Sequence, residues 1–179
     1  MRFSILFLFC LLASQQSQAS QEHFALDKLG TVRIEVPKGW TSIEKRLRAP
    51  LLLAAPMAQG ESFRAVLTLY PIEGLSAEQV IEAAGSVEAY RKAKRDWADK
   101  NHGSVVEFAS VTTEDWAHFG KVRRLGFTYE LSGKRFEERS YYFHCAGKAV
   151  HAKMLLPLGK RADADRIDAE GALRSLSCD

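Results

Sequence analysis

The sequence predicts an α+β fold, in which an antiparallel sheet of about six to seven strands is covered by a central long helix and by a C-terminal helix. Two observations support this prediction. Apolar and polar residues alternate in several short segments, whereas residues 77–100 and 161–179 show helical spacing of their apolar residues. The strand segments also occur in blocks that do not alternate with helices, which favours an antiparallel sheet over a wound parallel one.

Three segments before residue 72 are predicted strands. Residues 30–36 alternate apolar with polar side chains and end at Pro37, and residues 51–56 and 62–71 are also rich in apolar residues. We expect these three segments to form an antiparallel meander. In the third segment the alternation places Phe63 on the apolar side.

A long helix is predicted from about Ala77 to Lys100. Ser76 lies three residues before Gln79, which is the spacing of a capping box. Gly85 in the helix interior costs about 1 kcal/mol relative to alanine, and it indicates a kink or a junction between two shorter helices.

The second half of the chain returns to strand-like alternation. Four strands joined by hairpins are expected at residues 104–116, 121–133, 135–145 and 148–157. The remaining residues, 161–179, begin with aspartates and alanines and predict a terminal helix that ends near Cys178.

The N-terminus has the features of a secretory signal peptide. Arg2 precedes an apolar run at residues 3–13, and the small residues Ser17 and Ala19 follow at the spacing of a cleavage site. The run is too short for a membrane anchor, which needs roughly 18 to 20 apolar residues. We therefore expect cleavage after Ala19 and a mature protein that does not span the membrane. Its expected location is the periplasm, with the extracellular space as the alternative.

Residues 20–179 are expected to form a single globular domain. The 179-residue chain keeps 160 residues after loss of the signal peptide, which is a usual size for one domain. Loss of Arg2 lowers the formal net charge from +3 to +2. This charge is too small to favour a nucleic acid or a membrane surface as the partner.

Two cysteines remain after cleavage, Cys145 and Cys178. An even pair in an exported protein favours a disulfide, and the alternative is two free buried thiols. The bond would close a loop of about 34 residues and contribute about 3–4 kcal/mol to stability in the chain-entropy model.

Two stretches of sequence resemble a known group of proteins. "VRIEVPKGW" at residues 32–40 and "AGKAVHAKMLLP" at residues 146–157, with a long helix after the third strand, look like the PsbP and DcrB type of domain. The resemblance implies an α/β/α sandwich around an antiparallel sheet. It also implies a non-catalytic protein, because members of this group are accessory subunits, envelope proteins and adaptors that bind other proteins and share no catalytic residues.

Motifs for known chemistry do not occur in the sequence. It contains no phosphate-binding loop, no dinucleotide fingerprint and no nucleophile elbow. It also lacks the paired-cysteine and helical-histidine spacings of zinc sites. We therefore predict no catalytic residues, no bound metal and no cofactor.

A basic run at residues 90–100 is a candidate binding surface. Arg91, Lys92, Lys94 and Arg95 lie beside aromatic residues, which suits a nucleic acid, another anionic surface or an acidic protein partner, and Arg91, Lys92 and Arg95 are the candidate surface residues. Asp96 and Asp99 interrupt the run, so an ordinary solvated helix face is the competing interpretation.

His144, Cys145 and His151 are close in sequence, but strand alternation separates them. If Ala146 and Gly147 form a two-residue turn, Cys145 faces the core together with Phe143, while His144 and His151 share the opposite face. Cys145 then cannot join the histidines as a metal ligand or a nucleophile. His144 and His151 are left as candidate residues of a partner-binding surface. Glu137 and Glu138 point to opposite faces in the same way, and are a poor acid and base pair.

Three functions are compatible with the sequence. The first is an exported, non-enzymatic binding or accessory protein of the cell envelope that docks a protein partner. The second is an exported immunity or inhibitor protein that blocks a toxin enzyme. The third is a periplasmic hydrolase, for which His118, His144 and His151 are the residues to test.

Overall fold

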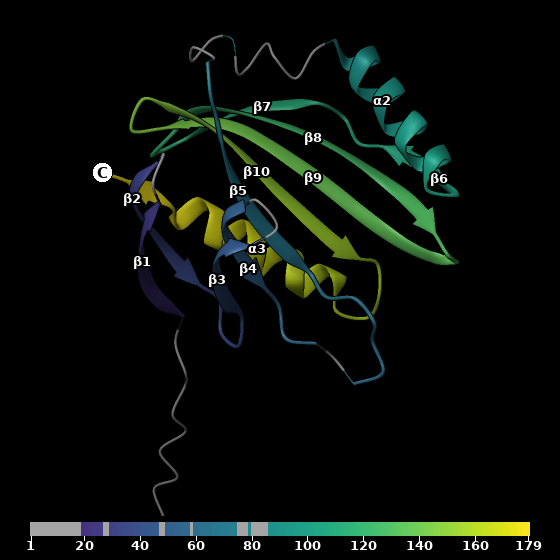
Figure 1. Cartoon of the computed structure of the whole chain (residues 1–179), viewed down its shortest axis with the longest axis horizontal. Coiled ribbons are helices and arrows are strands. Elements are labelled where there is room, and N and C mark those ends of the chain that lie inside the picture. Colours follow the sequence, from purple (N-terminus) through teal and green to yellow (C-terminus); the bar gives the residue numbers. More distant parts are fainter. Residues whose placement is uncertain (1–18, 27–28, 47–48, 58, 75–78, 80–85) are drawn as a thin grey trace, which may run out of the picture.

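The structure is a computed structural model that describes residues 19–26, 29–46, 49–57, 59–74, 79 and 86–179. The described residues form two antiparallel sheets and two helices (Figure 1). The strands are β1 Ser20–Leu26, β2 Gly30–Val36, β3 Thr41–Arg46, β4 Ala49–Ala54, β5 Val66–Ile72, β6 Gly103–Phe108, β7 Thr112–Trp116, β8 Gly120–Leu131, β9 Lys134–Cys145, β10 Lys148–Pro157 and β11 Ser177–Cys178, and the helices are α2 Val87–Lys100 and α3 Ala162–Ser175.

The larger sheet has eight strands in the order β3-β4-β5-β10-β9-β8-β6, and β7 also pairs with β8. The smaller sheet has the order β1-β2-β11. The α+β class and the antiparallel pairing are as predicted, but the expected six to seven strands were too few. One reason is that β3, with the sequence TSIEKR, lies at a sheet edge and carries little apolar alternation. Another is that residues 104–116, expected as one strand, form both β6 and β7.

The N-terminal meander does not consist of the strands that were predicted to form it. The meander consists of β3, β4 and β5, whereas β2 pairs with β1 on one side and with β11 on the other. The alternation of Val32, Ile34 and Val36 correctly predicted a strand, and all three side chains are buried. Alternation reports which face of a strand is buried, but it carries no information about which strand pairs with it.

The β9–β10 hairpin has the register that the sequence predicts. Cys145 lies opposite Lys148, and Tyr142 lies opposite His151. The two turn residues, Ala146 and Gly147, both have positive φ angles, 49° and 73°. This is the conformation of the two-residue turns that match the twist of a hairpin.

The two faces of the larger sheet carry different layers. On the α3 face, Tyr141, Phe143 and Cys145 of β9 are buried in the main core, which also contains apolar residues of α3, β1 and β2. On the opposite face, called the α2 face, Phe136 belongs to a second core with Phe127 and Tyr129, and Tyr90 of α2 packs on it. One helix therefore covers part of each face. In Figure 1, α2 lies beside β6, and α3 runs close to β10 and β2.

Helix α2 confirms the second half of the predicted long helix. The Ser86 side chain accepts a hydrogen bond from the backbone N–H of Ala89 at 3.0 Å, which caps the helix at Val87. The expected earlier part, including Ser76 and Gly85, lies outside the described residues.

Helix α3 ends earlier than predicted. It stops at Ser175, and Ser177 and Cys178 then form β11 against Arg33 and Val32 of β2. The unpaired edge of β2 provides backbone hydrogen bonds for these residues, so the chain end becomes a strand instead of a last helical turn.

Candidate functional site

His151 lies in an aromatic row that crosses three strands of the α2 face. It is directly opposite Tyr142 of β9 and Tyr70 of β5, with ring centroids 4.6 Å and 5.9 Å away. Its Nε2 atom lies 3.0 Å from the Ser140 Oγ. Burial lowers the pKa of His151 from 6.5 to about 4. The imidazole is therefore neutral at neutral pH.

His144 is a diagonal neighbour of His151, as the predicted register requires, because it lies opposite Ala149. Its Nε2 atom is buried and has no hydrogen-bond partner among the described residues. His118 is exposed between β7 and β8. Within the described residues no hydrogen bond or ring contact joins these three histidines. The same residues contain no group of three or more histidine, cysteine or acidic side chains arranged to hold a metal ion.

The hydrogen bond between His151 and Ser140 has the pairing of a base with a nucleophile, but its environment does not suit catalysis. Ser140 is only 2% exposed, so a substrate would have little access to its hydroxyl. An imidazole with a pKa of about 4 is also a weak base at neutral pH. The pair is better suited to holding β9 against β10.

A charged cluster lies next to this row on the α2 face. The Glu138 carboxylate of β9 contacts the Lys94 Nζ of α2 at 2.5 Å and the Lys153 Nζ of β10 at 3.2 Å. Burial alone would raise the pKa of Glu138, but the two ammonium groups outweigh burial and hold this pKa below its ordinary value. Glu138 is therefore ionised at neutral pH, and the cluster has two positive charges and one negative charge.

Glu137 and Glu138 point to opposite faces, as alternation predicts. Glu137 binds Arg166 of α3 at 2.7 Å and also pairs with Arg139, whereas Glu138 binds Lys94 of α2. Each carboxylate thus ties the sheet to a different helix. The two carboxylates do not form an acid and base pair.

The basic residues predicted on α2 divide into two groups. Arg91 and Arg95 place their guanidinium groups over the ring of Phe108, 5.6 Å and 5.0 Å from its centroid. Lys92 points away from the sheet and pairs with Asp96 at 2.7 Å. The sequence placed Lys94 in the basic run but did not single it out as a candidate surface residue, although its helical spacing from Tyr90 and Trp97 indicated that it points inward.

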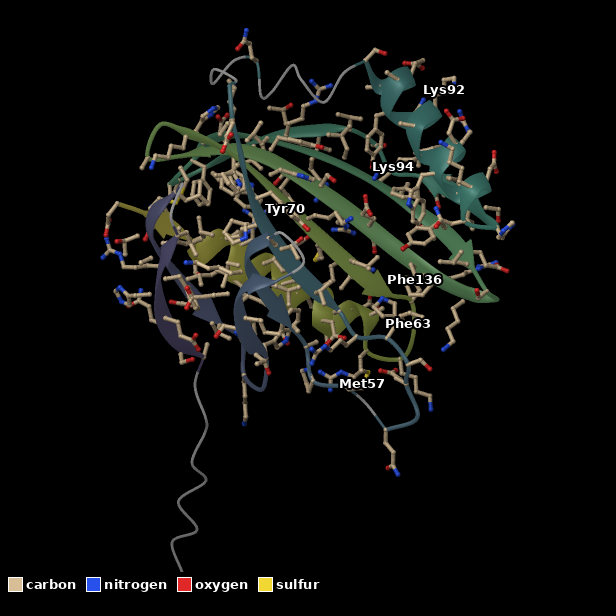
Figure 2. All side chains as sticks on the ribbon, viewed as in Figure 1. Met57, Phe63, Tyr70, Lys92, Lys94 and Phe136 are labelled. Carbon is tan, nitrogen blue, oxygen red and sulfur yellow. A yellow bond between two sulfur atoms is a disulfide. The ribbon has the colours of Figure 1, made fainter. Side chains whose placement is uncertain are left out.

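A pocket opens where three connecting segments meet at one end of the larger sheet, and we call it the loop-end pocket. It has a volume of about 450 Å³. Phe63 is 48% exposed at this site, and its ring lies edge-on to Phe136 at 5.2 Å. Figure 2 shows Phe63 beside Phe136. The pocket is lined by Gly60, Glu61, Ser62, Phe63, Glu130, Gly133, Lys134, Arg135, Phe136, Pro157, Leu158 and Gly159.

The sequence did not predict this pocket. Phe63 was expected on the apolar side of a strand, but β5 begins only at Val66, so Phe63 lies in the preceding connection. Leu158, which also lines the pocket, is 37% exposed. Exposed apolar side chains gathered around a pocket are typical of interaction sites.

Cys145 and Cys178 lie at disulfide distance in the structure. Their Sγ atoms are 1.96 Å apart and their Cα atoms 5.5 Å apart. Cys145 is buried in the main core, on the face opposite the two histidines. The pair connects the β9–β10 hairpin to β11 at the chain end.

Comparisons with known proteins identify the fold but not a close relative. No protein-family model and no curated protein matches the sequence. Among solved structures, the cyanobacterial PsbP (CyanoP) of Synechocystis sp. PCC 6803 is 12% identical, with a TM-score of 0.57 over 92% of this chain and 96% of that chain. LpqN of Mycobacterium tuberculosis, described as involved in cell envelope biogenesis, is 15% identical, with a TM-score of 0.56 over 90% of each chain.

The Ran-binding protein Mog1p of Saccharomyces cerevisiae is also similar, with 12% identity and a TM-score of 0.51 over 89% of this chain and 95% of that chain. These matches confirm the fold that the resemblance implied, because the chain has the same fold as the cyanobacterial PsbP, LpqN and Mog1p. No helix in the described part of the chain is both long and apolar enough to cross a membrane.

Proposed function

We propose that this protein is an exported, non-enzymatic accessory protein of the cell envelope that docks a protein partner. The observation that carries the proposal is the loop-end pocket, where Phe63 and Leu158 expose apolar surface around a concave site. Aromatic side chains at such positions commonly contribute a large share of the binding energy at protein interfaces.

The fold supports the proposal. Proteins with this fold include one described as Ran-binding and one described as involved in cell envelope biogenesis. Both descriptions fit an accessory or binding role. The segment after the predicted cleavage site also suits export, because β1 begins at Ser20 and would remain complete in the mature protein.

Affinity capture with matched variants tests the docking surface. The protein, purified after expression of the full chain, would be used to capture proteins from envelope extracts, followed by mass spectrometry. We expect Phe63→Ser to lose at least one protein that the wild type captures, because the serine removes the exposed aromatic ring. Ile167→Ser is the control, since Ile167 is 72% exposed on α3, which covers the other sheet face.

One result of the capture experiment would contradict docking at the loop-end pocket. If wild type, Phe63→Ser and Ile167→Ser capture the same proteins in the same amounts, the loop-end pocket is not the docking surface. Thermal unfolding of each variant verifies that it is folded before capture.

The enzymatic alternative has its own test. A broad hydrolase panel would be run on the wild type and on alanine variants of His118, His144 and His151. We expect no turnover that depends on these residues. Turnover that any of the three substitutions abolishes would replace the accessory role with an enzymatic one.

A further inference from the structure

The charged cluster on the α2 face has an excess of positive charge that no described group in the cluster balances. Lys94 and Lys153 share the single carboxylate of Glu138, and His151 beside them is neutral at neutral pH. The exposed fractions of the side chains are 24% for Lys94, 36% for Lys153 and 6% for Glu138. The amines are thus reachable from solvent, while the carboxylate between them is not.

The cluster is continuous with the loop-end pocket. Phe136 and Glu138 are two positions apart on β9, so their side chains point to the same face about 7 Å apart along the strand. On β10, Pro157 lies opposite Phe136, and Leu155 lies opposite Glu138. Lys94 belongs to α2, and in Figure 2 Phe136 lies between Lys94 and Phe63. An apolar site and a cationic site therefore follow one another along β9.

The charged residues at the loop-end pocket do not offset the excess positive charge of the cluster. Glu130 pairs with Arg135 at 3.6 Å. The Lys134 ammonium lies over the Phe63 ring at 5.0 Å and adds a positive charge, and Glu61 adds a negative one. The excess of positive charge thus remains at Lys94 and Lys153.

We propose that this face binds an extended segment of a partner protein that carries an aromatic side chain and, two residues away, an aspartate or glutamate. The aromatic side chain enters the loop-end pocket beside Phe63. The carboxylate accepts hydrogen bonds from Lys94 and Lys153. An extended segment repeats its side-chain direction every two residues, which matches the spacing of Phe136 and Glu138 on β9. This inference rests on the proposed docking function and specifies the chemistry of the partner.

A peptide selection tests the inference. Phage-displayed random dodecapeptides would be selected on the purified protein, and an enriched peptide would be labelled with fluorescein for anisotropy measurements. We expect enriched peptides to share an aromatic residue two positions from an acidic one. Replacing the acidic residue by its amide should weaken binding about tenfold, because a hydrogen bond to a charged group is lost.

Variants of the protein identify the contacting amines. Lys153→Met and Lys94→Met should each weaken binding of the enriched peptide about tenfold. Lys92→Met, on the outward side of the same helix as Lys94, should change it less than twofold. Lys153→Arg should retain binding. Glu138→Gln should strengthen binding of the peptide, because removing the internal carboxylate frees both amines. If a lysine variant does not fold, Glu138→Gln tests whether the amines bind the carboxylate of the peptide.

Other outcomes overturn the inference without affecting the proposed function. Enriched peptides that lack an acidic residue, or whose binding is unchanged in Lys153→Met and Glu138→Gln, would exclude the carboxylate site. If such peptides still lose affinity in Phe63→Ser, docking at the pocket remains and only its partner chemistry is wrong. If no peptide is enriched, the inference fails, and the envelope capture decides the docking function independently.

Discussion

At the scale of single residues, His151 shows how a titratable side chain can serve structure. It is stacked between two tyrosines and bonded to Ser140, and burial lowers its pKa to about 4. The negative charge of Glu138 raises this pKa, whereas the positive charges of Lys153 and Lys94 lower it further. The balance favours the neutral imidazole, which needs no counter-ion at this place in the sheet.

The lowered pKa predicts a loss of stability in mild acid. The unfolded chain binds a proton at His151 as the pH falls below 6.5, whereas the folded chain does so only near pH 4. The unfolded state therefore gains protons first, and the free energy of unfolding should fall by about 2 kcal/mol between pH 7 and pH 5 from this residue.

Urea unfolding at both pH values measures this effect. In His151→Phe the contribution should disappear, so the variant should lose less stability on acidification than the wild type. His118→Gln, at an exposed histidine, is the control. An equal loss in wild type and His151→Phe would show that His151 is not the cause.

At the scale of elements, the cysteine pair joins the end of the chain to the centre of the fold. The two-residue strand β11 pairs with β2, and Cys178 lies at disulfide distance from Cys145. Helix α3 lies between the two cysteines in sequence, so a bond between them would also restrict its residues in the unfolded chain.

We predict that the two cysteines form a disulfide in the exported protein. Alkylation followed by intact mass measurement should modify them only after reduction. The double substitution Cys145→Ser and Cys178→Ser should lower the free energy of unfolding by about 3–4 kcal/mol, because the unfolded chain regains the freedom of the closed loop. Reductant should not destabilise the double variant further. Alkylation of both thiols without reductant would refute the disulfide.

At the scale of the whole molecule, residues 1–19 are the predicted export signal, and most of them lie outside the described part of the chain. We predict that the full chain, expressed in a bacterium with a general secretory pathway, accumulates in the periplasm with Ser20 as its first residue. N-terminal sequencing and intact mass measurement of the fractionated protein check this. Deletion of residues 2–19 should retain the protein in the cytoplasm. A periplasmic protein that still begins at Met1 would contradict cleavage.

The sequence alone predicted those features that arise between near neighbours. Alternation along residues 135–157 gave the register of the β9–β10 hairpin, because a two-residue turn fixes which residues lie opposite each other. The same alternation separated Cys145 from His144 and His151, and sent Glu137 and Glu138 to opposite faces. Local patterns are sufficient for such statements, since strand geometry determines the direction of each side chain.

Only the tertiary structure decided which distant segments meet. The pairing of β2 with β1 and β11, the contact of Lys94 with Glu138, and the exposure of Phe63 beside Phe136 all join residues far apart in the chain. Alternation is the same whichever strand becomes the neighbour, so pairing depends on how the whole chain packs. For this reason the sequence determined the class of fold and the faces of its hairpin, whereas the candidate docking surface became visible only after the sheet had assembled.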